Sequence, residues 1–364
     1  MKIPRFPEIA PKTRERLLAP PAGPVSLVID TDAHNEIDDQ FALTWALLST
    51  DKLRVEAVYA APYSFAHYRE PLLRTYALLE GPPPGDAEAM RLLERYGGWV
   101  AGLKASGLHP RDIPFVSPAE GMALSHEEIL RVYEKLQIDP AGTVFRGADR
   151  YLTSLDEPVR SAAAEDLVAR ARAPRDGPLY VVAIGALTNI ASALLMAPET
   201  IHQLVVIWTA GFPAGVNRPN PSLNLEQDML ASQLLFECGV PLVYLPGFHV
   251  GAQLRLSLPE MEAWVRGKGA IGDYLYWLYT NNPLYPQRGI TGHFGRSWII
   301  WDLINIAWLL HPDWVPSDLI PTPALRDDTT WQRDLPGRPL MREAYEINRD
   351  AIFRDFFAKL EKAP

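Results

Sequence analysis

The chain has 364 residues, 48% of them hydrophobic, and a formal net charge of −9. This composition is ample for a large buried core. The negative charge and the lack of a Lys/Arg-rich block disfavour binding to nucleic acid and suit a cation or a neutral small molecule. The single cysteine, Cys238, excludes an intramolecular disulfide and a cysteine-based zinc site.

The N-terminal segment, residues 1–24, is rich in proline and basic residues, and we expect it to form a surface arm. It has no apolar core of a secretion signal, and no later stretch is apolar enough to span a bilayer. We therefore expect a cytoplasmic protein without a membrane partner.

From residue 25 onward, short apolar strands alternate with segments of helical apolar spacing. The predicted strands are "SLVID" (26–30), "RVEAVYAA" (54–61), "LYVVAIG" (179–185), "QLVVIWTAG" (203–211) and "PLVYLP" (241–246). Nearly all their residues are apolar, as in strands that are covered on both faces. The pattern predicts an α/β fold with an open, mainly parallel sheet and helices on both sides.

Three further segments complete the predicted organisation. Residues 86–140 read as a helical insertion, and "WIIWDLINIAWLLHP" (298–312) reads as a buried helix. Residues 321–364 form a C-terminal extension, in which an irregular stretch precedes an amphipathic helix that starts at Arg342. We therefore predict an arm (1–24), one α/β domain (25–320) and an extension packed on it (321–364).

Five acids lie at the junction between the first predicted strand and the helix that follows it: Asp30, Asp32, Glu36, Asp38 and Asp39. Ligands of open parallel sheets bind at the carboxyl ends of strands. The helix dipole favours acids in a first turn by about 0.3–1 kcal/mol each, which accounts for two of the five. It does not account for the whole group, because like charges repel. A hard cation such as Ca²⁺ or Mg²⁺ would resolve the repulsion, so we predict a metal or polyol site.

Other motifs with this acid spacing fit less well. An EF-hand loop that began at Asp30 would need glycine and glutamate at the positions of Asn35 and Phe41. A haloacid-type phosphatase also carries Asp-x-Asp after its first strand, but it usually continues with Gly-Thr. A phosphotransferase therefore stays as a distant alternative, and the Asp-x-Asp of glycosyltransferases is too short to use.

One more acid, Asp302, lies in the predicted late helix among Trp, Ile and Leu residues. An unpaired buried carboxylate costs several kcal/mol, so it needs a partner. Asn305 lies on the same helical face and is a candidate to orient it. Asp302 is either a capping acid bonded to a loop or a further carboxylate on the same cation. The second explanation accounts both for the acid cluster at residues 30–39 and for an acid in an apolar helix.

These motifs together resemble the inosine–uridine-preferring nucleoside hydrolase family. The resemblance rests on "DTDAHNEIDD", "VFRGADRYL", "VVAIGALTNIASAL", "NRPNPSLNLEQDMLAS" and "WDLINIAWLLHP", in the family's order, over roughly residues 25–313. It implies hydrolysis of the N-glycosidic bond of ribonucleosides, one bound Ca²⁺ at the pocket floor, and a dimer or tetramer of identical chains.

The resemblance also implies the metal site. Asp32 and Asp39 match acidic calcium ligands, Asp302 matches the acid of the late helix, and Ile184 matches a backbone carbonyl ligand. Asp30 would support the same site. Asp32 would act as the general base on a calcium-bound water.

For the sugar, Asp38 matches the acid that accepts the ribose 2′-hydroxyl, Asn224 matches the asparagine that grips the ribose, and Asn217 is a weaker candidate. Cleavage passes through a ribosyl cation, which surrounding negative charge favours.

Several positions depart from the family's pattern. The first motif is two residues longer, so His34, Asn35 and Glu36 form an extra projection that we predict at the pocket. Trp301 stands where many members have the histidine that protonates the leaving base. Trp301 either stacks on the base or is plain core, and His293 is a candidate replacement acid unless it is a surface histidine.

The main hypothesis is therefore a calcium-dependent ribonucleoside hydrolase. Its substrate is an ordinary nucleoside or, given the altered acid position, one with a modified base such as queuosine. The alternative is a ribose- or nucleoside-binding protein that keeps the calcium site but no longer hydrolyses its ligand, because it lacks the histidine.

Overall fold

The computed structural model describes residues 3–82, 85–282, 285 and 296–364. At its centre lies an eight-stranded sheet in the order β3-β2-β1-β4-β5-β6-β12-β9. The strands are β1 (Val25–Thr31), β2 (Leu53–Ala60), β3 (Val144–Arg146), β4 (Leu179–Ala183), β5 (Leu204–Ala210), β6 (Leu242–Pro246), β9 (Ser317–Pro321) and β12 (Leu340–Ala344). All neighbours pair in parallel except β12 and β9. The predicted open, mainly parallel sheet is confirmed.

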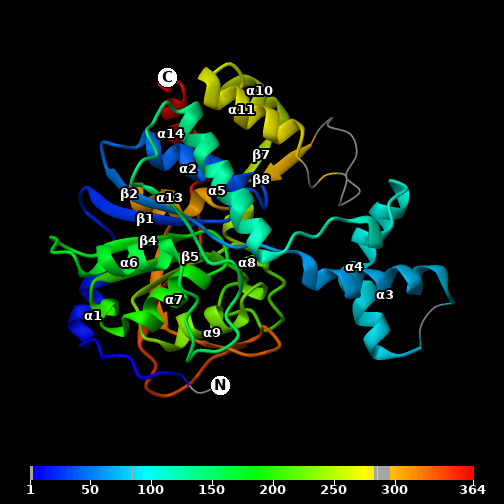
Figure 1. Cartoon of the computed structure of the whole chain (residues 1–364), viewed down its shortest axis with the longest axis horizontal. Helices are drawn as coiled ribbons and strands as arrows, with labels where there is room; N and C mark the ends of the chain where they lie inside the picture. Colours follow the sequence, from blue (N-terminus) through cyan, green and yellow to red (C-terminus); the bar gives the residue numbers. More distant parts are fainter. Residues whose placement is uncertain (1–2, 83–84, 283–284, 286–295) are drawn as a thin grey trace.

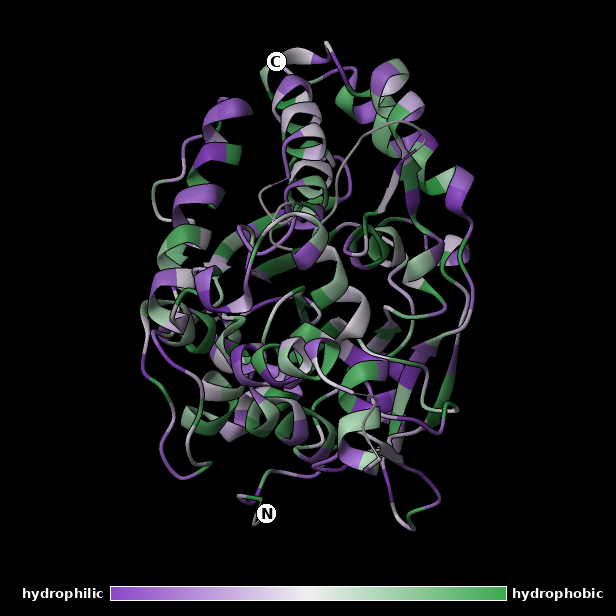
Figure 2. Ribbon diagram, turned by 90° about the vertical axis from the view of Figure 1, so that its right-hand side faces the viewer, coloured by the Kyte–Doolittle hydropathy of each residue, from purple (hydrophilic) through white to green (hydrophobic). Residues whose placement is uncertain are grey.

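Helices cover both faces of this sheet (Figure 1). One layer holds α2 (Asp38–Leu48), α5 (Pro118–Lys135), α11 (Gly269–Thr280), α13 (Leu303–Leu310) and α14 (Arg349–Leu360). The other holds α6 (Ala162–Arg172), α7 (Thr188–Met196) and α9 (Met229–Glu237). Because β4 and β5 are buried along their whole length, their side chains pack against both layers. Many outer helices carry both hydrophilic and hydrophobic residues, as expected of amphipathic helices that cover a hydrophobic core (Figure 2).

The shorter elements occupy the connections. They are α1 (Pro11–Leu17), α3 (Arg69–Glu80), α4 (Ala87–Ala105), α8 (Leu223–Glu226), α10 (Leu258–Trp264) and the 3₁₀ turns η1 (Ala66–Tyr68), η2 (Pro110–Asp112), η3 (Pro198–His202), η4 (Gly251–Gln253) and η5 (Pro312–Trp314). Two small antiparallel pairs join β7 (Arg255–Ser257) to β8 (Ser297–Ile299) and β10 (Ala324–Leu325) to β11 (Trp331–Gln332). No helix of the described ranges is long and apolar enough to cross a membrane.

The helical insertion predicted at 86–140 contains α4 and α5, and helical structure begins earlier, with α3. Helices α3 and α4 pack on each other and extend to one side of the sheet (Figure 1). A separate hydrophobic cluster holds them, built on Tyr63, Phe65, Tyr68, Leu72, Tyr96 and Val100. Helix α5 then returns to the sheet and packs on β2 and β3.

The chain termini are more integrated than the sequence predicts. Leu17 and Leu18 of the N-terminal segment are buried, and Arg14 donates to the carbonyl of Gly239 at 2.6 Å, so this segment is docked. The prediction of a C-terminal helix from Arg342 is wrong at its start. Residues 340–344 form β12 inside the sheet, and α14 begins at Arg349 after the Asn348 cap.

Strand β12 was missed because its charged residues look solvent-facing in the sequence. Arg342 donates to the carbonyls of Leu18 (2.8 Å) and Ser317 (2.7 Å), and Glu343 accepts from the backbone of Ala214 (2.7 Å). These partners satisfy the side chains within the fold, so two charges are tolerated in a sheet strand.

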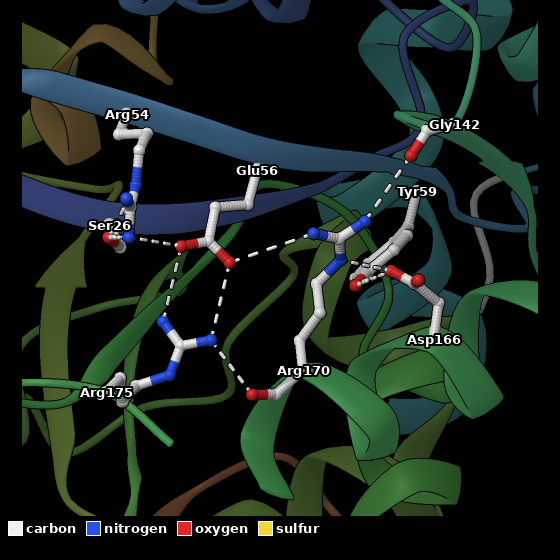
Figure 3. A network of polar contacts seen from close by, with 8 residues as sticks. All are labelled: Ser26, Arg54, Glu56, Tyr59, Gly142, Asp166, Arg170 and Arg175. Carbon is white, nitrogen blue, oxygen red and sulfur yellow. Dashed lines mark hydrogen bonds and ion pairs between the residues drawn. The ribbon is translucent and has the colours of Figure 1, made fainter. Parts of the chain in front are cut away.

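A network of charged groups joins β2 to α6 (Figure 3). Glu56 accepts hydrogen bonds from Arg54 (2.9 Å) and Arg175 (3.3 Å), and Arg170 lies 3.7 Å away. Arg170 also pairs with Asp166 at 2.6 Å. Burial, the largest single influence, raises the pKa of Glu56. The hydrogen bonds and charge of Arg175, the Ser26 hydrogen bond and the charge of Arg54 together outweigh burial, so the pKa is lowered.

We expect Glu56→Gln to lower the free energy of unfolding at neutral pH by about 1–3 kcal/mol, because charge-assisted hydrogen bonds to half-buried arginines are lost. A group with a lowered folded pKa stabilises above its unfolded pKa, and this contribution is lost as pH falls through the folded value. The difference between wild type and variant should therefore shrink in acid. Urea unfolding at several pH values measures it.

The matched control is Glu165→Gln, which removes an exposed pair with Arg160, and there we expect less than about 1 kcal/mol. Equal effects of the two substitutions would contradict a stabilising role for the network.

Candidate active site and metal centre

A cavity of about 670 Å³ lies where β1, β4 and β5 end. Among the described residues, five acids line it: Asp32, Glu36, Asp38, Asp39 and Asp302. Its walls include six aromatic side chains: Phe65, Tyr68, Trp99, Phe248, Trp298 and Trp301. A polar floor with aromatic walls is the usual composition of a site for a small, partly apolar ligand.

Three of the acids converge on one point. Asp38 and Asp39 begin α2, and Asp302 occupies the N-cap position of α13 without a side-chain capping hydrogen bond. One carboxylate oxygen of each lies within 4.8 Å of the others, and all three residues are buried. Two distant segments of the sequence thus meet at one edge of the sheet.

Asp32, another of the five acids, is 1% exposed and follows β1 directly. Its Oδ2 accepts a hydrogen bond from Asn35 Nδ2 at 3.1 Å. Its Oδ1 is buried and has no hydrogen-bond partner within the described ranges. A Cβ at Gly185 would lie 3.1 Å from this oxygen, so a side chain there would crowd the carboxylate.

The acids strongly perturb one another. Burial raises the pKa of Asp32, Asp38, Asp39 and Asp302 well above the ordinary value, and repulsion adds to it. Asp38 raises the pKa of both Asp32 and Asp302. Such a group needs protons or a cation to offset the repulsion.

These residues fit a divalent cation. The donors are all oxygens, which hard cations prefer, and Asp32 offers a buried oxygen without a protein donor. The Thr31 hydroxyl holds the carboxylate of Asp39 through a short hydrogen bond to its Oδ1. The tightest group of three contains Asp38, which the sequence assigns to the sugar, whereas Asp32, which the sequence assigns to the metal, lies outside it.

The predicted backbone and sugar contacts also reach the cavity. Ile184 follows β4, and its carbonyl accepts a hydrogen bond from Asn224 Nδ2 at 3.2 Å. The same amide nitrogen donates to the carbonyl of Thr209 at 3.1 Å. Because the Asn224 nitrogen is committed to backbone carbonyls, its side-chain oxygen is the atom available to a ligand.

Other predicted residues lie elsewhere. Asp30 does not line the cavity; it accepts from Asn189 Nδ2 at 2.8 Å, and burial raises its pKa to about 7. His34 turns away to the hydroxyl of Tyr63 at 2.9 Å, although Asn35 and Glu36 of the same projection reach the cavity. Asn217 is exposed and does not line it either.

The structure corrects the reading of the late helix. Residues 297–299 form β8, so α13 starts only at Leu303, and Asp302 lies at its N-cap position instead of in its interior. Asn305 does not orient the Asp302 carboxylate; its side chain bonds the carbonyls of Ala183 (3.3 Å) and Ile207 (3.1 Å). It ties α13 to β4 and β5.

Trp301 lines the cavity and packs edge-on against Phe248, with ring centroids 5.9 Å apart. Trp298 lines the same cavity. His293, the candidate replacement acid, lies outside the described residues.

The sequence does not predict the aromatic wall that residues before α3 and in α4 supply. Phe65, Tyr68 and Trp99 come from the segment before α3 and from α4, far from any acid motif. Their only signal in the sequence is a concentration of aromatic residues, which a hydrophobic core explains equally well.

Residues 27–348 match the inosine-uridine preferring nucleoside hydrolase family, and the chain belongs to that family. The non-specific ribonucleoside hydrolase RihC of Shigella flexneri is 35% identical over 147 residues, which cover 39% of this chain and 44% of the relative. The matched stretch thus spans less than half the length of this curated relative.

Solved structures share the fold. A purine-preferring ribonucleoside hydrolase from Gardnerella vaginalis aligns with a TM-score of 0.58 at 17% identity, covering 92% of this chain and 98% of that one. An inosine-uridine preferring nucleoside hydrolase from Bacillus anthracis aligns with a TM-score of 0.55 at 16% identity, covering 93% and 99%. At these identities the likeness concerns the fold alone.

We expect Ca²⁺ to stabilise the protein, by about 3–4 kcal/mol at 100 to 1,000 times its dissociation constant. Without a cation, the pKa values of these acids are higher in the folded than in the unfolded protein. Their contribution to the free energy of unfolding is then fully present only below the unfolded pKa, about 4, and it is lost as pH rises through the folded pKa values. Calorimetric unfolding with chelator or Ca²⁺, at about pH 5.5 and about pH 7.5, tests both effects.

The effect of Ca²⁺ should be larger at the higher pH and should disappear in Asp302→Asn. The exposed Asp328→Asn is the control and should respond like wild type. A thermal midpoint that is indifferent to Ca²⁺ at both pH values would contradict a metal centre here.

Proposed function

We propose that this protein hydrolyses the N-glycosidic bond of ribonucleosides, releasing ribose and the free base, with one bound Ca²⁺. The observation that carries the proposal is the convergence of four buried carboxylates, Asp32, Asp38, Asp39 and Asp302, on one cavity of a nucleoside hydrolase family member. Repulsion among them makes the group unfavourable unless it binds a cation, so a ligand-binding role explains why it exists.

Asp32, Asp39, Asp302 and the carbonyl of Ile184 would hold the cation, with Asp38 beside them. When bound, the ion supplies Lewis acidity and an anchor for hydroxyl groups. Calcium is favoured over magnesium because a carboxylate-rich set with a backbone carbonyl suits its larger coordination number.

Asp32 is the proposed general base. Asn35 holds one oxygen of its carboxylate, while the other has no hydrogen-bond donor within the described ranges. Each carboxylate oxygen has two lone pairs, so the carboxylate can hold one hydrogen bond on an oxygen and still accept the proton of the water that attacks the anomeric carbon. The residue lines the cavity, so the water and the sugar can reach it.

Asp38 and Asn224 are the proposed sugar contacts. A buried carboxylate accepts hydroxyl hydrogen bonds, and the Asn224 oxygen is a second acceptor whose direction its two backbone bonds fix. As the bond to the base breaks, positive charge develops on the ribose ring. The acids around the ring favour this charge, because they are preorganised before the substrate arrives.

The aromatic walls are the proposed site of the base. Stacking on a side chain such as Trp301 contributes about 1–3 kcal/mol per base without reading its identity. Because Trp301 cannot protonate a leaving group, bases that depart easily, or modified bases, are the favoured substrates. The same feature keeps a second candidate open, a nucleoside-binding protein without turnover.

We expect purified protein with Ca²⁺ to release ribose from at least one member of a panel of purine, pyrimidine and modified ribonucleosides. Asp32→Asn should lower kcat by about 10²–10⁴-fold, because the general base is lost. A reducing-sugar assay measures the release, and Asp328→Asn should match wild type.

Calorimetry with the same nucleosides separates the two candidates. Binding of a nucleoside with no ribose released would contradict the hydrolase and favour the binding protein.

A further inference from the structure

Gln227 is a buried polar residue between α8 and α9, and it does not line the cavity. Only 8% of it is exposed, and it stands three residues after Asn224. It has no role in the proposed hydrolysis, although amide groups are rarely buried without partners.

The orientation of the Gln227 amide is fixed. Its Oε1 accepts two hydrogen bonds of 2.7 Å, one from the backbone nitrogen of Ser64 and one from the hydroxyl of Tyr151. Because a backbone N–H can only donate, the oxygen must face Ser64, and the NH₂ group must face the other way. A flipped amide would place two donors against each other.

The NH₂ group of Gln227 has no hydrogen-bond acceptor within the described ranges. Gln227 Nε2 is buried and has no hydrogen-bond partner within the described ranges, and the same holds for Oδ1 of Asp32. One atom is a donor without an acceptor, and the other is an acceptor without a donor. Leaving either buried and unpaired is unfavourable.

The fold brings the two groups close together: a Cβ at Gly185 would lie 3.1 Å from Oδ1 of Asp32, the preceding Ile184 carbonyl accepts from Asn224, and Gln227 follows Asn224 by about one helical turn. The Gln227 amide acts on the Asp32 carboxylate and lowers its pKa, against the larger rise from burial. Asp32 in turn raises the pKa of the Tyr151 hydroxyl, after burial as the larger cause. Contacts of catalytic groups are often long before substrate binds and tighten in the complex.

We propose that Gln227 is a positioning residue whose amide N–H donates to Oδ1 of Asp32 and fixes the direction of that carboxylate, with Tyr151 and Ser64 holding the amide. Asn35 holds Oδ2 from the other side. The carboxylate plane is then set by two amides, one on each oxygen. The catalytic consequence rests on the proposed hydrolase function, whereas the structural consequence does not.

The test compares Gln227→Met with Gln233→Met. Gln233 is equally buried, at 7% exposed, and donates to the carbonyl of Leu325 (3.2 Å) and to Asp327 (2.8 Å), away from the cavity. Both substitutions remove a buried amide of the same size. We expect Gln227→Met to lower kcat by about 10–100-fold with little change in KM, and Gln233→Met to leave kcat unchanged.

Tyr151→Phe is the second variant, for the case that Gln227→Met does not fold. It keeps the donor and loosens its support, so kcat should fall less, again without a change in KM. Unchanged kcat in both Gln227→Met and Tyr151→Phe, or a loss that Gln233→Met shares, would overturn the positioning role.

Crystal structures of wild type and Gln227→Met give a readout that needs no turnover. Wild type should show Nε2 within about 3.2 Å of Oδ1 of Asp32, and the variant should show the carboxylate rotated. An unmoved carboxylate would overturn the proposal. If wild type releases no ribose, the hydrolase proposal fails, while the pair of structures still decides the role of Gln227.

Discussion

The mutual repulsion of buried carboxylates is the constraint on which the site depends. Asp38, Asp39 and Asp302 bring oxygens within 4.8 Å of one another inside a protein that is already acidic. No fold gains stability from this arrangement alone, since burial and like charge both penalise the ionised forms. The sheet, the helix starts and the surrounding amides therefore have to hold the acids together until a cation offsets the repulsion.

The parallel sheet supplies that support. Strands β1, β4 and β5 end side by side, so the residues that follow them share one edge. Asn305 ties α13 to β4 and β5 through two backbone carbonyls, which places Asp302 opposite the start of α2. In the middle of β2, Glu56 pairs with Arg170 of α6 and with Arg175, and these ion pairs join the sheet to the α6 segment.

Much of this could be predicted from the sequence. Apolar runs such as residues 203–211 identify the sheet, and the spacing of Asp32, Asp38 and Asp39 identifies its ligand edge. Strand β12 could not be predicted, because Arg342 and Glu343 are satisfied only by distant backbone groups. The cap position of Asp302 and the amide of Gln227 likewise depend on which segments meet in space, and local periodicity carries no such information.

The most direct measurement is a crystal structure of the protein with Ca²⁺, with the ion located by its anomalous scattering. We expect one ion with oxygens of Asp32, Asp39 and Asp302 at about 2.3–2.6 Å. Ordered acids with no ion between them at saturating Ca²⁺, or an ion bound without Asp302, would contradict this account. Its central claim is that Asp32 and Asp39, from an early segment, and Asp302, from a late one, bind the same metal ion.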